Sequence, residues 1–143
     1  MTSPLPDPAT TFGAKVRARL AEEAVAWLTV VAPDGTPQPN PVAFLWNGDD
    51  RVLVYSQAGA ARLSHLASNP RVALSFNNRH GFGDVVVLTG TAERALSEPP
   101  ATDNARFMAK YADYLGDVGM DASWYAATFS EPITIRLRAS RGT

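Results

Sequence analysis

The sequence has no cysteine, which excludes disulfide bonds, thiolate metal sites and a cysteine nucleophile. Its two histidines, His65 and His80, are too few for a histidine-rich metal site. No apolar run approaches the roughly 20 residues that cross a membrane. The net charge is −1, from 13 basic and 14 acidic side chains, and gives no general attraction to nucleic acid or anionic lipid. We therefore expect a cytoplasmic protein whose partners include no metal, nucleic acid or membrane.

Apolar residues make up 45% of the chain, which is enough for a hydrophobic core and argues against disorder. A length of 143 residues suits one domain. Residues 1–10 hold three prolines and no apolar core segment, so we expect a flexible tail and not a signal peptide. The folded domain is then expected to cover residues 11–143.

Hydrophobic periodicity predicts short strands joined by tight turns, with helices in three peripheral places. Asn47-Gly48 is the strongest hairpin signal. A parallel nucleotide-binding sheet would need a helix between successive strands, and the sequence lacks these helices. The predicted fold class is mainly β with peripheral helices, as a six-stranded antiparallel barrel. The expected strands cover residues 24–31, 38–46, 51–56, 72–76, 84–93 and 133–138, and the expected helices cover 12–23, 60–68, a region between 99 and 116, and 121–129.

The sequence pattern also predicts which side chains of these elements face water, which are buried, and where one helix ends. Lys15, Arg17 and Arg19 are expected to face water on the first helix, opposite its apolar stripe. The run 85–88 is apolar at every position, which predicts a central strand covered on both faces. Gly116 is the expected end of the helix that precedes residue 121.

The strand over residues 38–46 contains Pro39 and Pro41, so it is expected at an edge of the sheet. Gln38 and Asn40 alternate on it and point to the same face. They either hydrogen-bond the rim of a heterocycle or form the exposed face of an edge strand, and the residues alone leave both readings open. Because a small barrel has little interior room, a ligand site is expected on its outside, where a second subunit could close it.

Ser56, Gln57 and Arg62 follow the strand 51–56 and form the clearest candidate site. A hydroxyl, an amide and a guanidinium are groups that grip a phosphate. The alternative is an ordinary polar loop followed by a solvated helix arginine. No catalytic acid, base or metal site is visible in the sequence, which suits a protein whose chemistry is supplied by a redox cofactor.

The segments 55–57 and 62–73, ending in Asn69-Pro70 before the next strand, resemble the pyridoxamine 5'-phosphate oxidase-like split β-barrel superfamily. The strand Asn40 to Trp46 looks like the cofactor-facing strand of that family. The resemblance implies an FMN-binding split barrel that forms homodimers with cofactor sites at the interface. It places Ser56 and Arg62 at the phosphate. The other implied cofactor-binding residues are Gln38, Asn40, Pro41 and Val42 on the ring-facing strand, with Tyr55, Gln57 and Asn77 beside the site.

The Asn-Pro-Val strand and the short chain look most like the branch that uses the deazaflavin F420. In the FMN oxidases two adjacent basic residues usually grip the phosphate, whereas this sequence has Ala61-Arg62 at the matching pair. The resemblance therefore implies an F420-dependent oxidoreductase that transfers a hydride between the cofactor and a small unsaturated organic substrate. The alternatives are an FMN-dependent oxidoreductase and a non-catalytic flavin- or haem-binding protein of the same fold.

Overall fold

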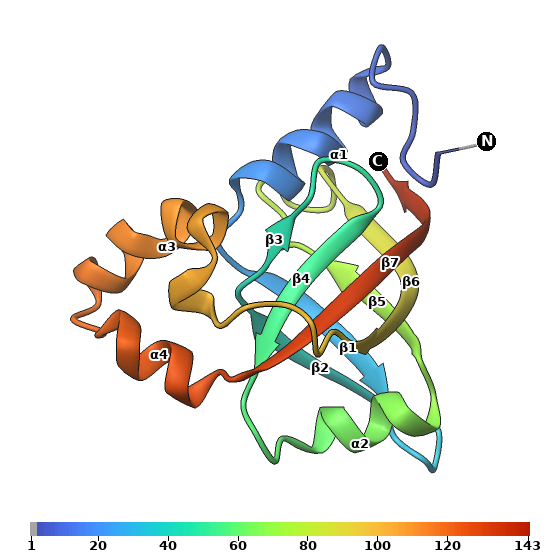
Figure 1. Ribbon diagram of the computed structural model, residues 1–143. Coiled ribbons are helices and arrows are strands. Elements are labelled where there is room, and N and C mark those ends of the chain that lie inside the picture. The colour runs from blue at the N-terminus through green and yellow to red at the C-terminus, as the bar shows by residue number, and fades with distance from the viewer. Residues whose placement is uncertain (1–2) are drawn as a thin grey trace.

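Seven antiparallel strands curl into one sheet in the computed structural model, which describes residues 3–143 (Figure 1). The spatial order is β2-β1-β5-β6-β7-β4-β3, so β2 and β3 are the two edges. The elements are α1 (Thr11–Glu22), β1 (Ala26–Val31), β2 (Pro37–Val42), β3 (Leu45–Trp46), β4 (Arg51–Ser56), α2 (Ala61–Ser68), β5 (Arg71–Ser75), β6 (Val86–Arg94), a 3-10 turn (Ala101–Asp103), α3 (Ala105–Asp117), α4 (Ala122–Thr128) and β7 (Glu131–Gly142).

The curled sheet encloses the main hydrophobic core. Alternate residues of the strands point inward, and Leu28, Leu88 and Ile135 are fully buried there. α1 lies across one end of the barrel and α2 across the other (Figure 1). This confirms the predicted mainly β barrel with peripheral helices.

β6 and β7 pair along most of their length at the centre of the sheet, and their pairing contains a bulge at Thr89/Gly90. A Cβ atom at Gly90 would lie 2.0 Å from the carbonyl oxygen of Arg136. A side chain at this position would therefore force the two strands apart, which explains the glycine inside a strand.

A second hydrophobic cluster lies outside the barrel, where α3 and α4 cover β4. Tyr55 of β4 packs edge-on against Phe107 of α3, with 5.0 Å between the ring centroids. Tyr111 and Leu115 lie on the same stripe of α3, and Tyr125 meets them from α4. Phe107, Tyr111 and Leu115 therefore form one buried stripe along α3.

Several details differ from the sequence-based predictions. The expected strand 38–46 is two strands, β2 and β3, because the chain leaves the sheet at Ala43-Phe44, which raises the count from six to seven. The central strand β6 has one buried face only, since Val87 is half-buried between Val86 and Leu88. α3 continues to Asp117, and the positive φ of 69° belongs to Gly119.

The segment before α1 packs against the domain wherever the structure describes it. Leu5 is buried with the main core. The carbonyl oxygen of Pro6 accepts a hydrogen bond from Arg17, and that of Pro4 accepts one from Ser140. Residues 1 and 2 of the expected tail lie outside the described residues. Flexibility of residues 1–10 stays a prediction, but these contacts attach residues 4–6 to the barrel.

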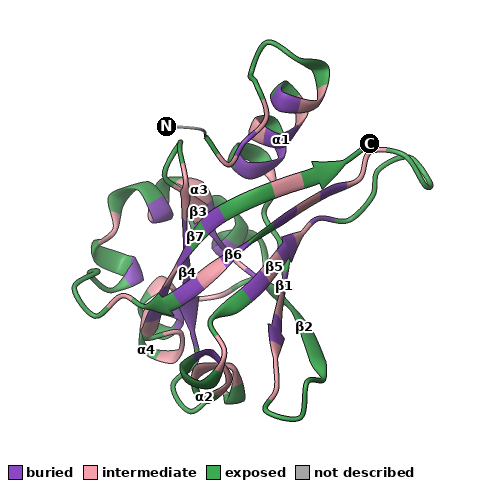
Figure 2. Ribbon diagram, turned by 90° about the vertical axis from the view of Figure 1, so that its right-hand side faces the viewer, coloured by how far each residue is buried: buried purple, intermediate pink, exposed green. Residues whose placement is uncertain are grey.

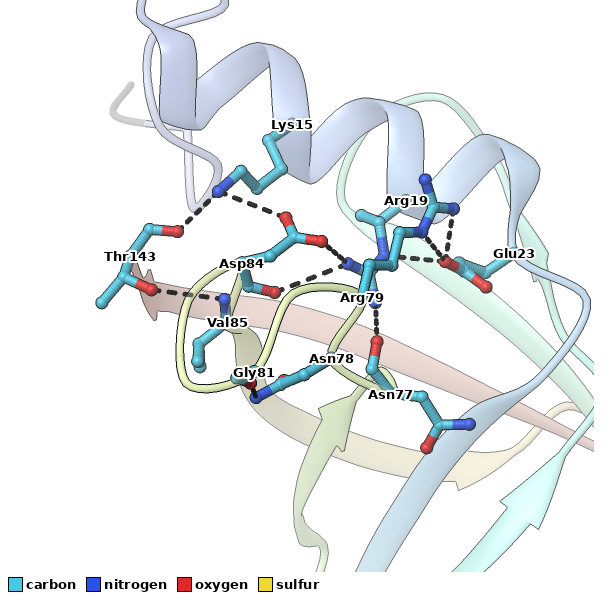
Figure 3. A network of polar contacts seen from close by, with 10 residues as sticks. All are labelled: Lys15, Arg19, Glu23, Asn77, Asn78, Arg79, Gly81, Asp84, Val85 and Thr143. Atoms are coloured by element: carbon cyan, nitrogen blue, oxygen red, sulfur yellow. Dashed lines mark hydrogen bonds and ion pairs between the residues drawn. The ribbon is translucent and has the colours of Figure 1, made fainter.

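Arg19, expected in water, is buried beneath the loop between β5 and β6 (Figure 3). Its guanidinium bonds Asp84 and the carbonyl oxygen of Asn77, and its Nε lies 2.8 Å from Glu23. Arg79 of the same loop also donates to Glu23. The first helix is therefore tied to the loop 77–84 by charged side chains.

The exposed side of the sheet lies on β1, β2, β5 and β6. Figure 2 shows these strands with the helices at their margins, and five of the six residues of β2 are exposed. The predicted edge position of the proline-bearing strand is confirmed. Among residues 3–143, no helix has the length and apolar character needed to span a membrane.

Candidate cofactor-binding site

The predicted phosphate site lies where β4 ends and the chain turns into α2. β4 finishes at Ser56, and the loop 57–60 leads into the helix, with Gly59 at a φ of 79° that only glycine adopts readily. Ala60 at the N-cap offers no side-chain acceptor to the helix. The first N–H groups of a helix have no partner inside it, so this uncapped end is suited to an anion.

Arg62 is the cation at this end of the barrel. Its side chain is half-buried, and no hydrogen bond or ion pair links it to any other residue among 3–143. Burial lowers the pKa of its guanidinium, because the charged form has lost water without gaining a counterion. A partly desolvated cation without a partner in the protein is the arrangement expected of an anion-binding site.

Ser56 and Gln57 differ in how accessible they are. Ser56 is fully buried, and its hydroxyl donates to the carbonyl oxygen of Gln57 at 3.3 Å. Gln57 is exposed in the loop before α2. A ligand phosphate can reach the Gln57 amide directly, whereas Ser56 needs a rotation of its hydroxyl or a small opening of the loop. Their roles in phosphate binding stay predictions.

The predicted ring-facing residues lie along β2. Gln38 and Asn40 pair with Val30 and Leu28 of β1, so their side chains share the core-facing side of the sheet. Both are nonetheless exposed, because β2 is the free edge. Val42, next on this face, is buried in the core, while Pro41 faces the other way and is exposed. The edge therefore presents two amides and an apolar end.

Two predicted site residues lie away from the α2 end. The hydroxyl of Tyr55 donates to the carbonyl oxygen of Pro99 at 2.8 Å, and its ring lies in the second hydrophobic cluster. Asn77 follows β5 and lies about 20 Å along the extended chain from Arg71, where β5 begins next to α2. Its side-chain oxygen accepts a hydrogen bond from the Trp27 indole at 2.9 Å. Cofactor contacts by Tyr55 and Asn77 stay predictions, and both residues have other partners in this chain.

Two residues beside the site were not predicted from the sequence. His65 lies three positions after Arg62, on the neighbouring part of the α2 surface, and its Nδ1 is buried without a hydrogen-bond partner. Tyr111 fixes the segment that joins β2 to β3, because its hydroxyl accepts from the backbone N–H of Phe44 at 2.8 Å. The helical spacing was a signal for His65, but nothing in the sequence indicated the Tyr111 contact.

Lys110 also holds the β2–β3 junction. Its ammonium donates to the carbonyl oxygen of Phe44 at 2.8 Å and lies 3.5 Å from the centroid of the Phe44 ring. Burial lowers the pKa of Lys110 to about 8. Lys110 and Tyr111 thus hold the chain where it leaves the sheet, next to the predicted ring-facing strand.

Among the cavities formed by residues 3–143, two outside the barrel lie close to β2 or β4. One, of about 940 Å³, opens between β4, β7 and the loop 93–99. The other, of about 250 Å³, lies between α3, α4 and the end of β2, and Pro41 and Val42 line it. No cluster of three or more potential metal ligands occurs within residues 3–143.

The profile of the pyridoxamine 5'-phosphate oxidase family matches residues 12–134. The chain belongs to this family. The match covers the barrel from α1 into β7, including the α2 end and the free edge β2. No curated protein matches the sequence.

Several solved structures share the fold of this chain. An F420 reductase is 21% identical with a TM-score of 0.62, and the match covers 87% of this chain and 94% of that one. A Listeria innocua protein described as a pyridoxamine 5'-phosphate oxidase is 19% identical with a TM-score of 0.65, covering 90% and 95%. An FAD-binding protein from Mesorhizobium loti is 18% identical with a TM-score of 0.62, covering 89% and 90%. These likenesses establish the split-barrel fold.

Proposed function

We propose that the chain is an oxidoreductase that binds the deazaflavin F420 and transfers a hydride between this cofactor and a small unsaturated organic substrate. The observation that carries the proposal is Arg62, a half-buried cation without a partner at an uncapped helix end. Membership of the pyridoxamine 5'-phosphate oxidase family supports a flavin-type cofactor. The F420 reductase and the FAD-binding protein of the same fold add support for this cofactor class.

The groups present fit a phosphate-bearing flavin-type cofactor. Arg62 would bind the phosphate through charge-assisted hydrogen bonds, with the N–H groups of the α2 end and the Gln57 amide beside it. Gln38 and Asn40 on the free edge offer amide donors and acceptors to a heterocycle. Pro41, exposed on the other side of β2, would offer an apolar contact that excludes water, and the buried Val42 would anchor this end of the strand in the core.

The cofactor supplies the hydride chemistry when it is bound. The protein then has to orient the ring and hold the phosphate, so it needs no nucleophile of its own. The sequence offers no candidate catalytic acid, base or metal centre, and this fits such a division of work.

F420 is proposed over FMN because of position 61. The resemblance to FMN oxidases implies two adjacent cations at the phosphate, and Ala61 supplies none. A charge-assisted hydrogen bond contributes roughly 1.5–3 kcal/mol, so one missing cation weakens the hold on an FMN phosphate by about 10-fold or more.

A homodimer is proposed as the functional unit. Ala73 of β5 pairs with Thr29 and Thr89, and all three lie on the outer side of the sheet, where no helix among residues 3–143 covers them. The free edge of β2 lies next to this face. A second subunit on this face would add a wall to the site that one barrel leaves open.

Parallel titrations of the purified protein with F420 and with FMN, followed by fluorescence, test the proposal. Stronger binding of F420 is expected, and Ala61→Arg is expected to raise FMN affinity about 10-fold. Sub-micromolar FMN affinity without F420 binding would contradict it in favour of an FMN protein. Turnover of reduced F420 with unsaturated substrates then separates an enzyme from a binding protein.

Light scattering at micromolar concentration tests the dimer. The wild-type chain is expected to have twice the mass of one chain, and Ala73→Arg is expected to be monomeric and to bind F420 weakly. Glu98→Arg, in an exposed loop, is the control for an added charge. A wild-type monomer that binds F420 at full strength would show that one barrel suffices.

A further inference from the structure

The cavity of about 250 Å³ beside β2 has almost entirely apolar walls. Residues from α3 and α4 form one side, and the segment just before β1 with the end of β2 forms the other. The lining residues that the argument uses are Val25, Pro41, Val42, Leu115, Tyr125 and Phe129. A dry apolar cavity of about 150 Å³ already holds benzene, so this one has room for a substituted ring.

The hydroxyl of Tyr125, a residue of the cavity wall that is 8% exposed, has no hydrogen-bond partner in the part of the chain that the structure describes. The two buried tyrosines nearby differ in this respect: Tyr55 donates to Pro99, and Tyr111 donates to the carbonyl oxygen of Ala24 at 2.7 Å. The Tyr125 hydroxyl is therefore a donor in the cavity wall that is free to bond a ligand.

The Tyr125 side chain is held rigidly enough to serve as a fixed donor. Its ring stacks on Phe129 with 4.5 Å between the centroids and on Phe107 with 5.9 Å. Burial raises the pKa of Tyr125 to about 12, so the hydroxyl keeps its proton throughout the physiological range.

The cavity is continuous with the proposed ring-binding strand. Pro41 and Val42 belong to both, because they end β2 and also line the cavity wall. A molecule in the cavity would therefore lie next to a cofactor ring placed along β2.

We propose that this cavity is the substrate site and that it binds an apolar, ring-sized carbonyl compound whose oxygen accepts a hydrogen bond from Tyr125. The assignment of the ligand as substrate rests on the proposed function, whereas the binding of such a compound to the cavity does not.

Acetophenone and α-methylstyrene test this inference, because they have nearly the same shape and only the ketone has an acceptor. Calorimetric titration of the cofactor-free protein is expected to show tighter binding of acetophenone. Tyr125→Phe keeps the stacking and removes the hydroxyl, so it is expected to lower acetophenone affinity about 2- to 13-fold and leave α-methylstyrene unchanged.

Val25→Trp, at the exposed rim of the cavity, is expected to lower the affinity for both compounds. Leu96→Trp, on an exposed loop away from the cavity, is expected to change neither affinity. Equal affinities in wild type and Tyr125→Phe, or no binding by the wild type, would overturn the inference.

Titration with F420 in the presence of acetophenone separates this inference from the proposed function. Binding of F420 without binding of acetophenone would overturn the inference about the cavity and leave the cofactor proposal intact. If acetophenone binds in a Tyr125-dependent way and F420 does not bind, the inference about the cavity stands. The proposed function, and with it the assignment of the ligand as substrate, would then be overturned.

Discussion

Arg19 and Asp84 are 65 positions apart and form an ion pair, with 2.9 Å between Nη1 of the arginine and Oδ2 of the aspartate (Figure 3). The arginine is only 2% exposed, so this charge is removed from water by α1 and the loop above it. Asp84 has a positive φ of 62°, which makes the loop turn back toward the helix. The pair therefore fixes the loop 77–84 onto α1.

The first prediction concerns Arg19. Arg19→Met removes the buried hydrogen bonds to Asp84 and the Asn77 carbonyl oxygen and the ion pair with Glu23, and is expected to lower the free energy of unfolding by about 2–3 kcal/mol. Urea denaturation measures the change. Lys15→Met removes a more exposed charge that also contacts Asp84, and is expected to cost less than about 1 kcal/mol. Equal effects of the two variants would show that burial of Arg19 is unimportant.

The second prediction concerns acid pH. Burial alone would raise the pKa of Asp84, but the hydrogen bond from Lys15 and the charge of Arg19 hold it below its ordinary value of 3.8. A carboxyl with a lowered folded-state pKa stabilises the protein above the unfolded-state value, and this contribution is lost as the pH falls through the folded-state value. The melting temperature is therefore expected to drop on acidification below pH 3.8.

Asp84→Asn tests the origin of this drop, because asparagine also tolerates a positive φ. The variant is expected to melt lower than wild type near neutral pH and to lose less on acidification. Asp113→Asn, on an exposed part of α3, is the control and is expected to follow the wild-type curve. An Asp84→Asn curve parallel to wild type would assign the acid sensitivity to other carboxyls.

The strands were predictable because their apolar residues alternate and their turns contain Asn-Gly and Asn-Pro. The burial of Arg19 was not predictable, because it depends on a loop whose sequence position is 58 to 65 residues away. The split between β2 and β3 was missed for a similar reason: the junction at Phe44 is held by Lys110 and Tyr111 from α3. Long-range contacts of this kind leave no local pattern in the sequence.

The candidate site shows the same limit. Arg62 could be singled out because it follows a strand end, but its lack of a partner is a property of the folded chain. Tyr55 and Ser56 are adjacent in sequence and were grouped as neighbours of one site. In a strand they point to opposite sides of the sheet, and Tyr55 lies under α3 while Ser56 faces the barrel.

The third prediction concerns the junction held by Tyr111. Tyr111→Phe leaves the buried N–H of Phe44 and the carbonyl oxygen of Ala24 without this partner, and is expected to lower the free energy of unfolding by about 1–3 kcal/mol. Tyr114→Phe, whose hydroxyl has no hydrogen bond within residues 3–143, is the matched control and is expected to change stability little. Thermal and urea denaturation of both variants measure the difference.

The fourth prediction separates ligand binding from folding at Arg62. Because its half-buried guanidinium is partly desolvated and has no partner, the charge of Arg62 is expected to add nothing to the stability of the cofactor-free protein. Arg62→Met keeps the length of the side chain and removes the charge. The cofactor-free variant is expected to melt at or above the wild-type temperature.

The same variant is expected to bind F420 about 10- to 150-fold more weakly, since a charge-assisted hydrogen bond to phosphate contributes roughly 1.5–3 kcal/mol. Arg71→Met, at an exposed position that begins β5, controls for the loss of one positive charge and is expected to bind normally. Fluorescence titration gives the affinities, and calorimetry gives the melting temperatures. An affinity within about twofold of wild type would make Arg62 a plain surface charge. An unpaired cation is not expected to stabilise the fold that buries it. A collapse of the melting temperature would therefore show that Arg62 has a structural role.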